Sequence, residues 1–90
     1  MQKMEIASAF ALVLKKHRDA KGFSQELLAE KADLHPTHVS LIERKLRNPS
    51  LNVAKSLAES LGVTLTEMIA EAEQIQKHSE GKKHINSKMD

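Results

Sequence analysis

The chain has 90 residues, which is enough for one domain, and its net charge of +2 at pH 7 is too small to identify a partner by itself. The absence of cysteine excludes disulfides and thiolate metal sites and suits a reducing cytoplasm. The chain has only two aromatic residues, is rich in Ala, Leu, Lys and Glu, and contains no apolar run long enough to span a membrane. These features favour a cytoplasmic all-α domain without a membrane partner.

Charge is distributed unevenly along the chain. Residues 1–49 contain nine Lys or Arg and six Asp or Glu, whereas residues 50–78 contain two and four. A basic front half suits a protein that offers one face to phosphate groups. An ordinary solvated surface explains the same counts, so charge alone leaves both interpretations open.

The first predicted helix covers residues 6–21, and residues 1–5 before it are expected to be flexible. Its buried face is marked by residues at helical spacing, namely Phe10, Val13, Leu14 and His17. Gly22 is the predicted stop, because glycine accepts the left-handed conformation found just past helix ends.

A second short helix is predicted to begin after Ser24, whose hydroxyl caps it. Leu27 and Leu28 are expected to cover its inner side. Asp33 stands at the following turn, and Asp is one of the few non-glycine residues that adopt a positive φ at little cost.

The third predicted helix starts with His35 near the N-cap and Pro36 as its first residue, where a missing N–H costs nothing. Val39 and Ile42 point inward at a spacing of three residues. Two short helices joined by so sharp a turn have the layout of a helix-turn-helix, whose second helix can enter a DNA major groove.

Two more helices complete the predicted domain, which spans residues 6–78. Ser50 caps a helix that Gly62 ends, and Thr64 with Glu67 forms a capping box for the last helix. Apolar residues then continue at helical spacing: Leu65, Met68, Ile69, Ala72 and Ile75. Residues 79–90 are polar and are predicted to form a disordered tail.

Residues 10–69 resemble the Xre/Cro-type, lambda-repressor-like helix-turn-helix proteins. The resemblance rests on short runs in the order typical of that family: Arg18, Lys21-Gly22-Phe23-Ser24-Gln25, Leu28-Ala29, Val39-Ser40, Ile42-Glu43-Arg44, Arg47-Asn48-Pro49-Ser50-Leu51, Leu57-Ala58 and Leu61-Gly62-Val63. It implies a compact five-helix fold with the helix-turn-helix in helices 2 and 3. Small chains with Arg-Asn-Pro-Ser resemble restriction–modification controller proteins, although small repressors and antitoxins share the pattern.

The resemblance and the exposed side of the third helix together suggest a DNA-binding surface. The residues expected to read bases are Thr37, His38, Ser40 and Leu41. Those expected to contact the DNA backbone are Gln25, Arg44, Lys45, Arg47 and Asn48. Burial of Leu41 in the core and a merely solvated basic loop are the alternatives.

The resemblance also implies an ion pair between Arg18 and Glu43 that sets the angle of the third helix. This sequence departs from the family in four places. Asp33 and Lys45 stand where glycine is usual, and His17 stands before Arg18 where Leu or Ile is usual. Pro36 stands where many members place a base-reading side chain.

We therefore expect a sequence-specific transcription regulator that binds double-stranded DNA as a homodimer on a two-fold-related operator. Its predicted dimer surface comprises Leu65, Met68, Ile69 and Ile75, unless these residues only close the monomer core. The alternative function is an antitoxin-like module that holds a toxin-like protein, and RNA polymerase is a further candidate partner.

No enzyme, cofactor or metal site is predicted. His35 and His38 lack an evident third ligand, so a metal centre is not expected. The serines lie mostly at helix starts or on exposed faces, where no catalytic base is suggested.

Overall fold

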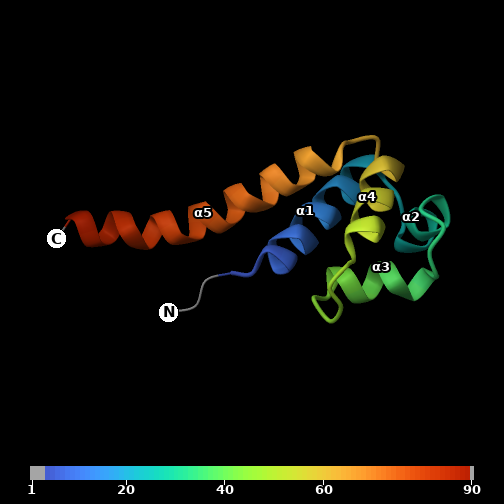
Figure 1. Ribbon diagram of the computed structural model, residues 1–90, viewed down its shortest axis with the longest axis horizontal. Helices are drawn as coiled ribbons and strands as arrows, with labels where there is room; N and C mark the ends of the chain where they lie inside the picture. The colour runs from blue at the N-terminus through green and yellow to red at the C-terminus, as the bar shows by residue number, and fades with distance from the viewer. Residues whose placement is uncertain (1–3, 90) are drawn as a thin grey trace.

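A computed structural model describes residues 4–89, with side chains described as far as Ser79. Its elements are α1 (Ile6–Lys21), α2 (Gln25–Lys31), α3 (Pro36–Glu43), α4 (Leu51–Ser60) and α5 (Leu65–Met89). Helices α1 to α4 form a compact group, while α5 runs beside α1 and continues beyond it, so the molecule measures 50 × 23 × 22 Å (Figure 1). The predicted five-helix all-α fold is confirmed.

Short polar residues begin the helices where the sequence predicted. The hydroxyls of Ser24 and Ser50 each accept the backbone N–H three residues further on, at 2.9 and 3.1 Å. Thr64 and Glu67 form a reciprocal capping box with distances of 2.9 and 3.0 Å. These local bonds satisfy donors that would otherwise have no partner at the helix starts.

Within residues 4–89, two non-glycine residues adopt the left-handed conformation, one on each side of α3. Asp33, between α2 and α3, has φ = 58°, and Lys45, just after α3, has φ = 64°. These are the two positions where the resembled family usually has glycine. Asp tolerates this conformation better than Lys, because its short polar side chain can form local hydrogen bonds.

The core lies where α1, α2, α3, α4 and the first half of α5 meet. Leu14, Ile42, Leu57 and Met68 are among its largest fully buried side chains. The prediction for Leu27 was wrong, because this side chain is 38% exposed. Leu28 and Ala29, the next two residues of α2, are buried instead, which turns Leu27 toward solvent.

Met68 does not belong to a surface, so its assignment to a dimer contact was wrong. Its side chain is 0% exposed within the monomer, as is that of Ala72 one turn later. The physical reason is that this stripe of α5 packs onto the core and closes it. Leu65, Ile69 and Ile75 pack against the same core and are only partly buried.

Helix α5 extends to Met89, whereas the sequence predicted a disordered tail from residue 79. Extending an existing helix fixes one residue for each new hydrogen bond, so it costs less than starting one, and Lys and Glu in this stretch are good helix formers. Most of the predicted flexible segment at residues 1–5 lies outside the described residues. Within it, the carbonyl of Met4 accepts a hydrogen bond from Gln76 of α5 at 2.9 Å.

A polar cluster joins α1 to α5 at the edge of the core. Glu71 of α5 lies 3.1 Å from the Lys16 amine and 3.0 Å from the Nε2 atom of His17. Partial burial acts to raise the pKa of Glu71, but its hydrogen bonds with Lys16 and His17 outweigh that effect and lower the pKa below its ordinary value of 4.5. The charged carboxylate is therefore favoured in the folded chain.

We expect Glu71→Gln to lower the free energy of unfolding at pH 7. A lowered folded-state pKa adds stability that is present above pH 4.5 and disappears as the pH falls through the folded-state value. Urea unfolding of both proteins from pH 7 down to pH 3 should therefore show their difference shrinking. Glu73→Gln, at an exposed position of the same helix, is the control. A difference that stays constant with pH would contradict the assignment.

Candidate nucleic-acid interface

Helices α2 and α3 are held together by their turn and by apolar contacts with the core. The N–H of Leu34 donates to the carbonyl of Ala29 at 2.8 Å, which closes the turn. Val39 and Ile42 are 0% and 1% exposed, so one side of α3 is fixed inside the domain. The opposite side of α3 lies at the edge of the globule (Figure 1).

The four residues predicted to read bases do not share one degree of exposure. Thr37 is exposed, whereas His38, Ser40 and Leu41 are half-buried. Leu41 is therefore neither fully exposed, as a base-reading role suggests, nor buried in the core, which was the alternative. Thr37, in the first turn of α3, is the most accessible of the four.

The first turn of α3 is organised by His35. The Nδ1 atom of this N-cap residue accepts the backbone N–H of Thr37 at 3.2 Å and lies 2.9 Å from the Thr37 hydroxyl. Pro36 is the first helical residue, as predicted. The side chain of Thr37 is therefore tied to the cap, a link that residue spacing alone did not predict.

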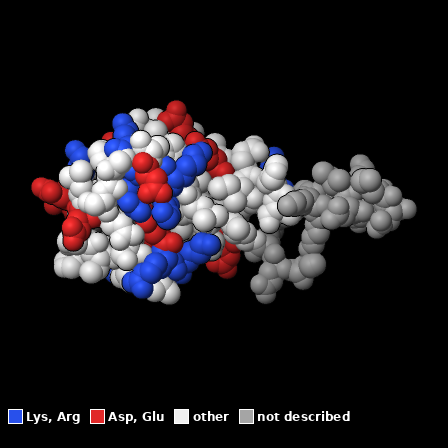
Figure 2. Space-filling view, turned by 180° about the vertical axis from the view of Figure 1, so that it is seen from behind, with Lys and Arg blue, Asp and Glu red and all other residues white. Residues whose placement is uncertain are grey.

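Basic and polar side chains follow α3 directly. Arg44, Lys45, Arg47 and Asn48 are all exposed, and Arg44 Nε donates to the Ser40 hydroxyl at 3.3 Å. Lys and Arg side chains gather at the lower edge of the globule, the level at which α3 and its following loop lie (Figures 1 and 2). This surface supplies positive charge beside the exposed side of α3, as phosphate contacts require.

Gln25 lies at the start of α2 and is half-buried. The sequence predicted that it contacts phosphate. In the structure its Nε2 donates to the Glu43 carboxylate at 2.9 Å. One N–H of the side-chain amide is therefore occupied inside the protein, and the side chain is held in one orientation beside the N-terminus of α2.

The ion pair implied by the resemblance is present. Arg18 Nε donates to one carboxylate oxygen of Glu43 at 2.6 Å, and Nη2 donates to the other at 2.9 Å. Arg18 Nη1 also donates to the Phe23 carbonyl at 2.8 Å. Both charged side chains are nearly buried, at 11% and 4% exposure. The hydrogen bond to Glu43 raises the pKa of Arg18 above its ordinary value, so the pair remains ionised.

Two leucines beside the basic loop are exposed, and for Leu51 this overturns the prediction from helical spacing, which places it with Ala54 and Leu57 on the buried face of α4. Leu46 is 65% exposed between Lys45 and Arg47, and Leu51 is 77% exposed at the start of α4. Their position next to charged and capping residues was the available signal.

Among the described side chains, no cluster of three or more His, Asp or Glu could hold a metal ion. None of the described helices is long and apolar enough to cross a membrane.

The architecture and parts of the sequence match known proteins. The family described as Helix-turn-helix matches residues 14–68. Control protein C.MunI from Mycoplasma sp is 39% identical over 70 residues, which cover 77% of this chain and 95% of that protein. The restriction-modification controller protein C.AhdI from Aeromonas hydrophila is 37% identical, with a TM-score of 0.66 over 69% of this chain and 94% of that one.

A third match concerns the fold alone. The clp gene regulator ClgR from Corynebacterium glutamicum superposes with a TM-score of 0.85 over 96% of this chain and 92% of that one, at 21% identity. Its coverage includes almost the whole length of this chain. Helix α5 is therefore part of an architecture that is also found in a solved structure.

We expect Arg18→Ala to reduce the free energy of unfolding by about 3–5 kcal/mol, because it leaves the Glu43 carboxylate buried without its cation. Replacing both partners, as in Arg18→Met with Glu43→Leu, should cost much less. Urea unfolding of the single and double variants measures both values. A loss of less than about 1 kcal/mol in the single variant would show that the pair contributes no more than a surface ion pair.

Proposed function

Because the chain belongs to the helix-turn-helix family of DNA-binding transcription regulators, we propose that it is a repressor or controller protein that recognises a specific operator as a homodimer. The observation that carries this proposal is the exposed first turn of α3, flanked by the basic loop at residues 44–48. Such an arrangement lets one helix enter the major groove while neighbouring cations contact phosphates.

The ion pair between Arg18 and Glu43 supports this proposal. It links α1 to α3, and Gln25 of α2 donates to the same carboxylate. The two helices of the helix-turn-helix are therefore tied to the domain through one buried charge pair. A recognition helix must keep a constant angle to its domain, since small rotations displace every base contact along it.

The relatives support the controller role within this class. C.MunI is named a control protein, and C.AhdI is named a restriction-modification controller protein. A DNA partner also supports action in the cytoplasm. The comparisons give no support to a toxin-like partner or to contact with RNA polymerase, so neither belongs to the proposal.

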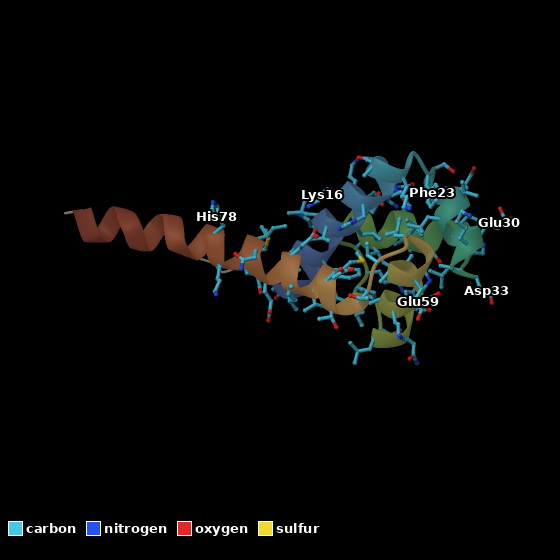
Figure 3. The ribbon with its side chains drawn as sticks, turned by 90° about the horizontal axis from the view of Figure 1, so that it is seen from above. Lys16, Phe23, Glu30, Asp33, Glu59 and His78 are labelled. Carbon is cyan, nitrogen blue, oxygen red and sulfur yellow. The ribbon has the colours of Figure 1, made fainter. Side chains whose placement is uncertain are left out.

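Homodimerisation is proposed through the exposed side of α5. This helix projects beyond the globule, and His78 lies on the projecting part (Figure 3). An open groove of about 570 Å³ lies beside it, lined by Met4, Gln74, Ile75, His78 and Ser79. Leu65, Ile69 and Ile75 are only partly buried by the monomer, so a second copy could cover their remaining apolar surface. Two copies would present two recognition helices to successive half-sites.

Selection from a random DNA pool tests the DNA-binding proposal. The wild-type chain should enrich an inverted repeat, and Thr37→Ala should blur defined positions in each half. Arg47→Ala should instead weaken binding to all sequences and reduce the slope of affinity against salt by about 1. Thr66→Ala, an exposed position on α5, is the control and should change neither property. Enrichment of no sequence, with binding that only fades with salt, would contradict the proposal.

Sedimentation velocity tests the homodimer. The wild-type chain should sediment as a dimer at micromolar concentration, and Ile75→Asn should shift it toward monomer by placing a polar group in the proposed interface. Lys77→Asn, an exposed position two residues away, should leave the dimer intact. Circular dichroism checks that each variant remains folded. A wild-type monomer both with and without DNA would overturn this part of the proposal.

A further inference from the structure

The ring of His35 lies beside the most exposed of the proposed base-reading side chains. Two atoms of Thr37 approach the same nitrogen of this ring, the backbone N at 3.2 Å and the hydroxyl Oγ1 at 2.9 Å from Nδ1. No comparison or family resemblance assigns a role to this contact. The contact limits whether the Thr37 hydroxyl can donate or accept a hydrogen bond with DNA.

The backbone contact determines the direction of both hydrogen bonds. A backbone N–H can only donate, so Nδ1 of His35 must accept and the ring proton must lie on Nε2. A nitrogen that carries no proton cannot donate to the Thr37 hydroxyl either. The Thr37 hydroxyl therefore donates to Nδ1 as well, and the two donors share the single lone pair of this nitrogen.

A hydroxyl has one proton to donate and two lone pairs to accept with. Because the proton of Thr37 points to His35, its oxygen can only accept toward the DNA. Phosphate oxygens are acceptors, as are guanine O6 and N7 and thymine O4, so none of these can pair with it. In the major groove, the exocyclic amines of adenine N6 and cytosine N4 are the donors that fit.

We propose that His35 is a positioning residue that sets the polarity of the Thr37 hydroxyl, so that Thr37 reads the exocyclic amine of an adenine or cytosine in each half-site. This inference rests on the proposed function, since it presumes that α3 enters the major groove. It deepens that function by naming the chemical group that is recognised and the residue that enforces the choice.

Ser40 provides an internal contrast on the same helix. Its hydroxyl oxygen accepts from Arg44 Nε at 3.3 Å, which leaves its own proton available. Ser40 can therefore donate to guanine, thymine or phosphate, whereas Thr37 cannot while His35 holds its proton. Two chemically similar hydroxyls in α3 thus have opposite hydrogen-bonding polarity.

Three variants separate this polarity from helix capping. Thr37→Val removes the hydroxyl but keeps the shape of the side chain. His35→Gly removes the ring acceptor at small cost to the cap, because glycine is itself an acceptable N-cap residue. His35→Asn is the rescue variant, because its Oδ1 occupies nearly the position of Nδ1 and accepts in the same way. Circular dichroism confirms that each variant is folded before binding is measured.

The first step locates the base pair that Thr37 contacts, as the selected position whose preference disappears in Thr37→Val. Operators are then made that lack one group at this pair. Purine for adenine, or pyrimidin-2-one for cytosine, removes the amine. 5-Methylpyrimidin-2-one for thymine, or 2-aminopurine for guanine, removes the oxygen of the paired base. Binding of each operator to wild type and to Thr37→Val gives a double-mutant cycle that cancels the change in duplex stability.

Loss of the amine should weaken wild-type binding by about fivefold relative to Thr37→Val, the effect expected for one neutral hydrogen bond. Loss of the oxygen should have no such effect. Inverting the natural base pair should be penalised by wild type and by His35→Asn, and much less by His35→Gly, whose free hydroxyl can turn and donate.

The inference would be overturned if binding depended on the oxygen of the paired base instead of on the amine. It would also be overturned if His35→Gly penalised the inverted base pair as strongly as wild type does. If Thr37→Val changes no selected position, the inference fails while the proposed function stands. If wild type enriches no sequence at all, the proposed function itself fails and the inference fails with it.

Discussion

The buried ion pair between Arg18 and Glu43 is the interaction on which the arrangement of the helices depends. Its charges come from α1 and from the last residue of α3, and Gln25 of α2 joins through the same carboxylate. Two nearly buried charges are costly to hold unless their hydrogen-bonding groups are satisfied. Here the guanidinium forms three hydrogen bonds, two to Glu43 and one to the Phe23 carbonyl. The pair therefore joins the end of α3 to α1 with its hydrogen-bonding groups satisfied, and we propose that it fixes the orientation of α3.

The exposed chemistry of the interface follows from that orientation. With Val39 and Ile42 in the core, Thr37 and the basic loop remain outside. Thr37 is linked to His35 and Ser40 to Arg44, so neither hydroxyl is an unconstrained rotor. The proposed interface therefore combines a helix anchored in the core with side chains whose hydrogen-bonding directions are already limited before DNA binds. Such preorganisation reduces the entropy lost on binding.

The sequence predicted most of the fold because its signals were local. Gly22 ends α1 with φ = 72°, and Ser24, Ser50 and the Thr64–Glu67 box begin their helices as expected. Asp33 adopts the predicted positive φ. Each of these features depends on a few neighbouring residues, so it can be inferred without knowing what the helix packs against.

What the sequence alone determined is therefore the five helices, their caps, the helix-turn-helix and the family to which they belong. The tertiary structure decided which side chains remain accessible. It buried Met68 and exposed Leu27, because burial depends on how helices distant in sequence approach one another. It also bound Gln25 to Glu43 and Thr37 to His35. Helical spacing indicates which residues share a face, but only packing and side-chain geometry decide what each of them contacts.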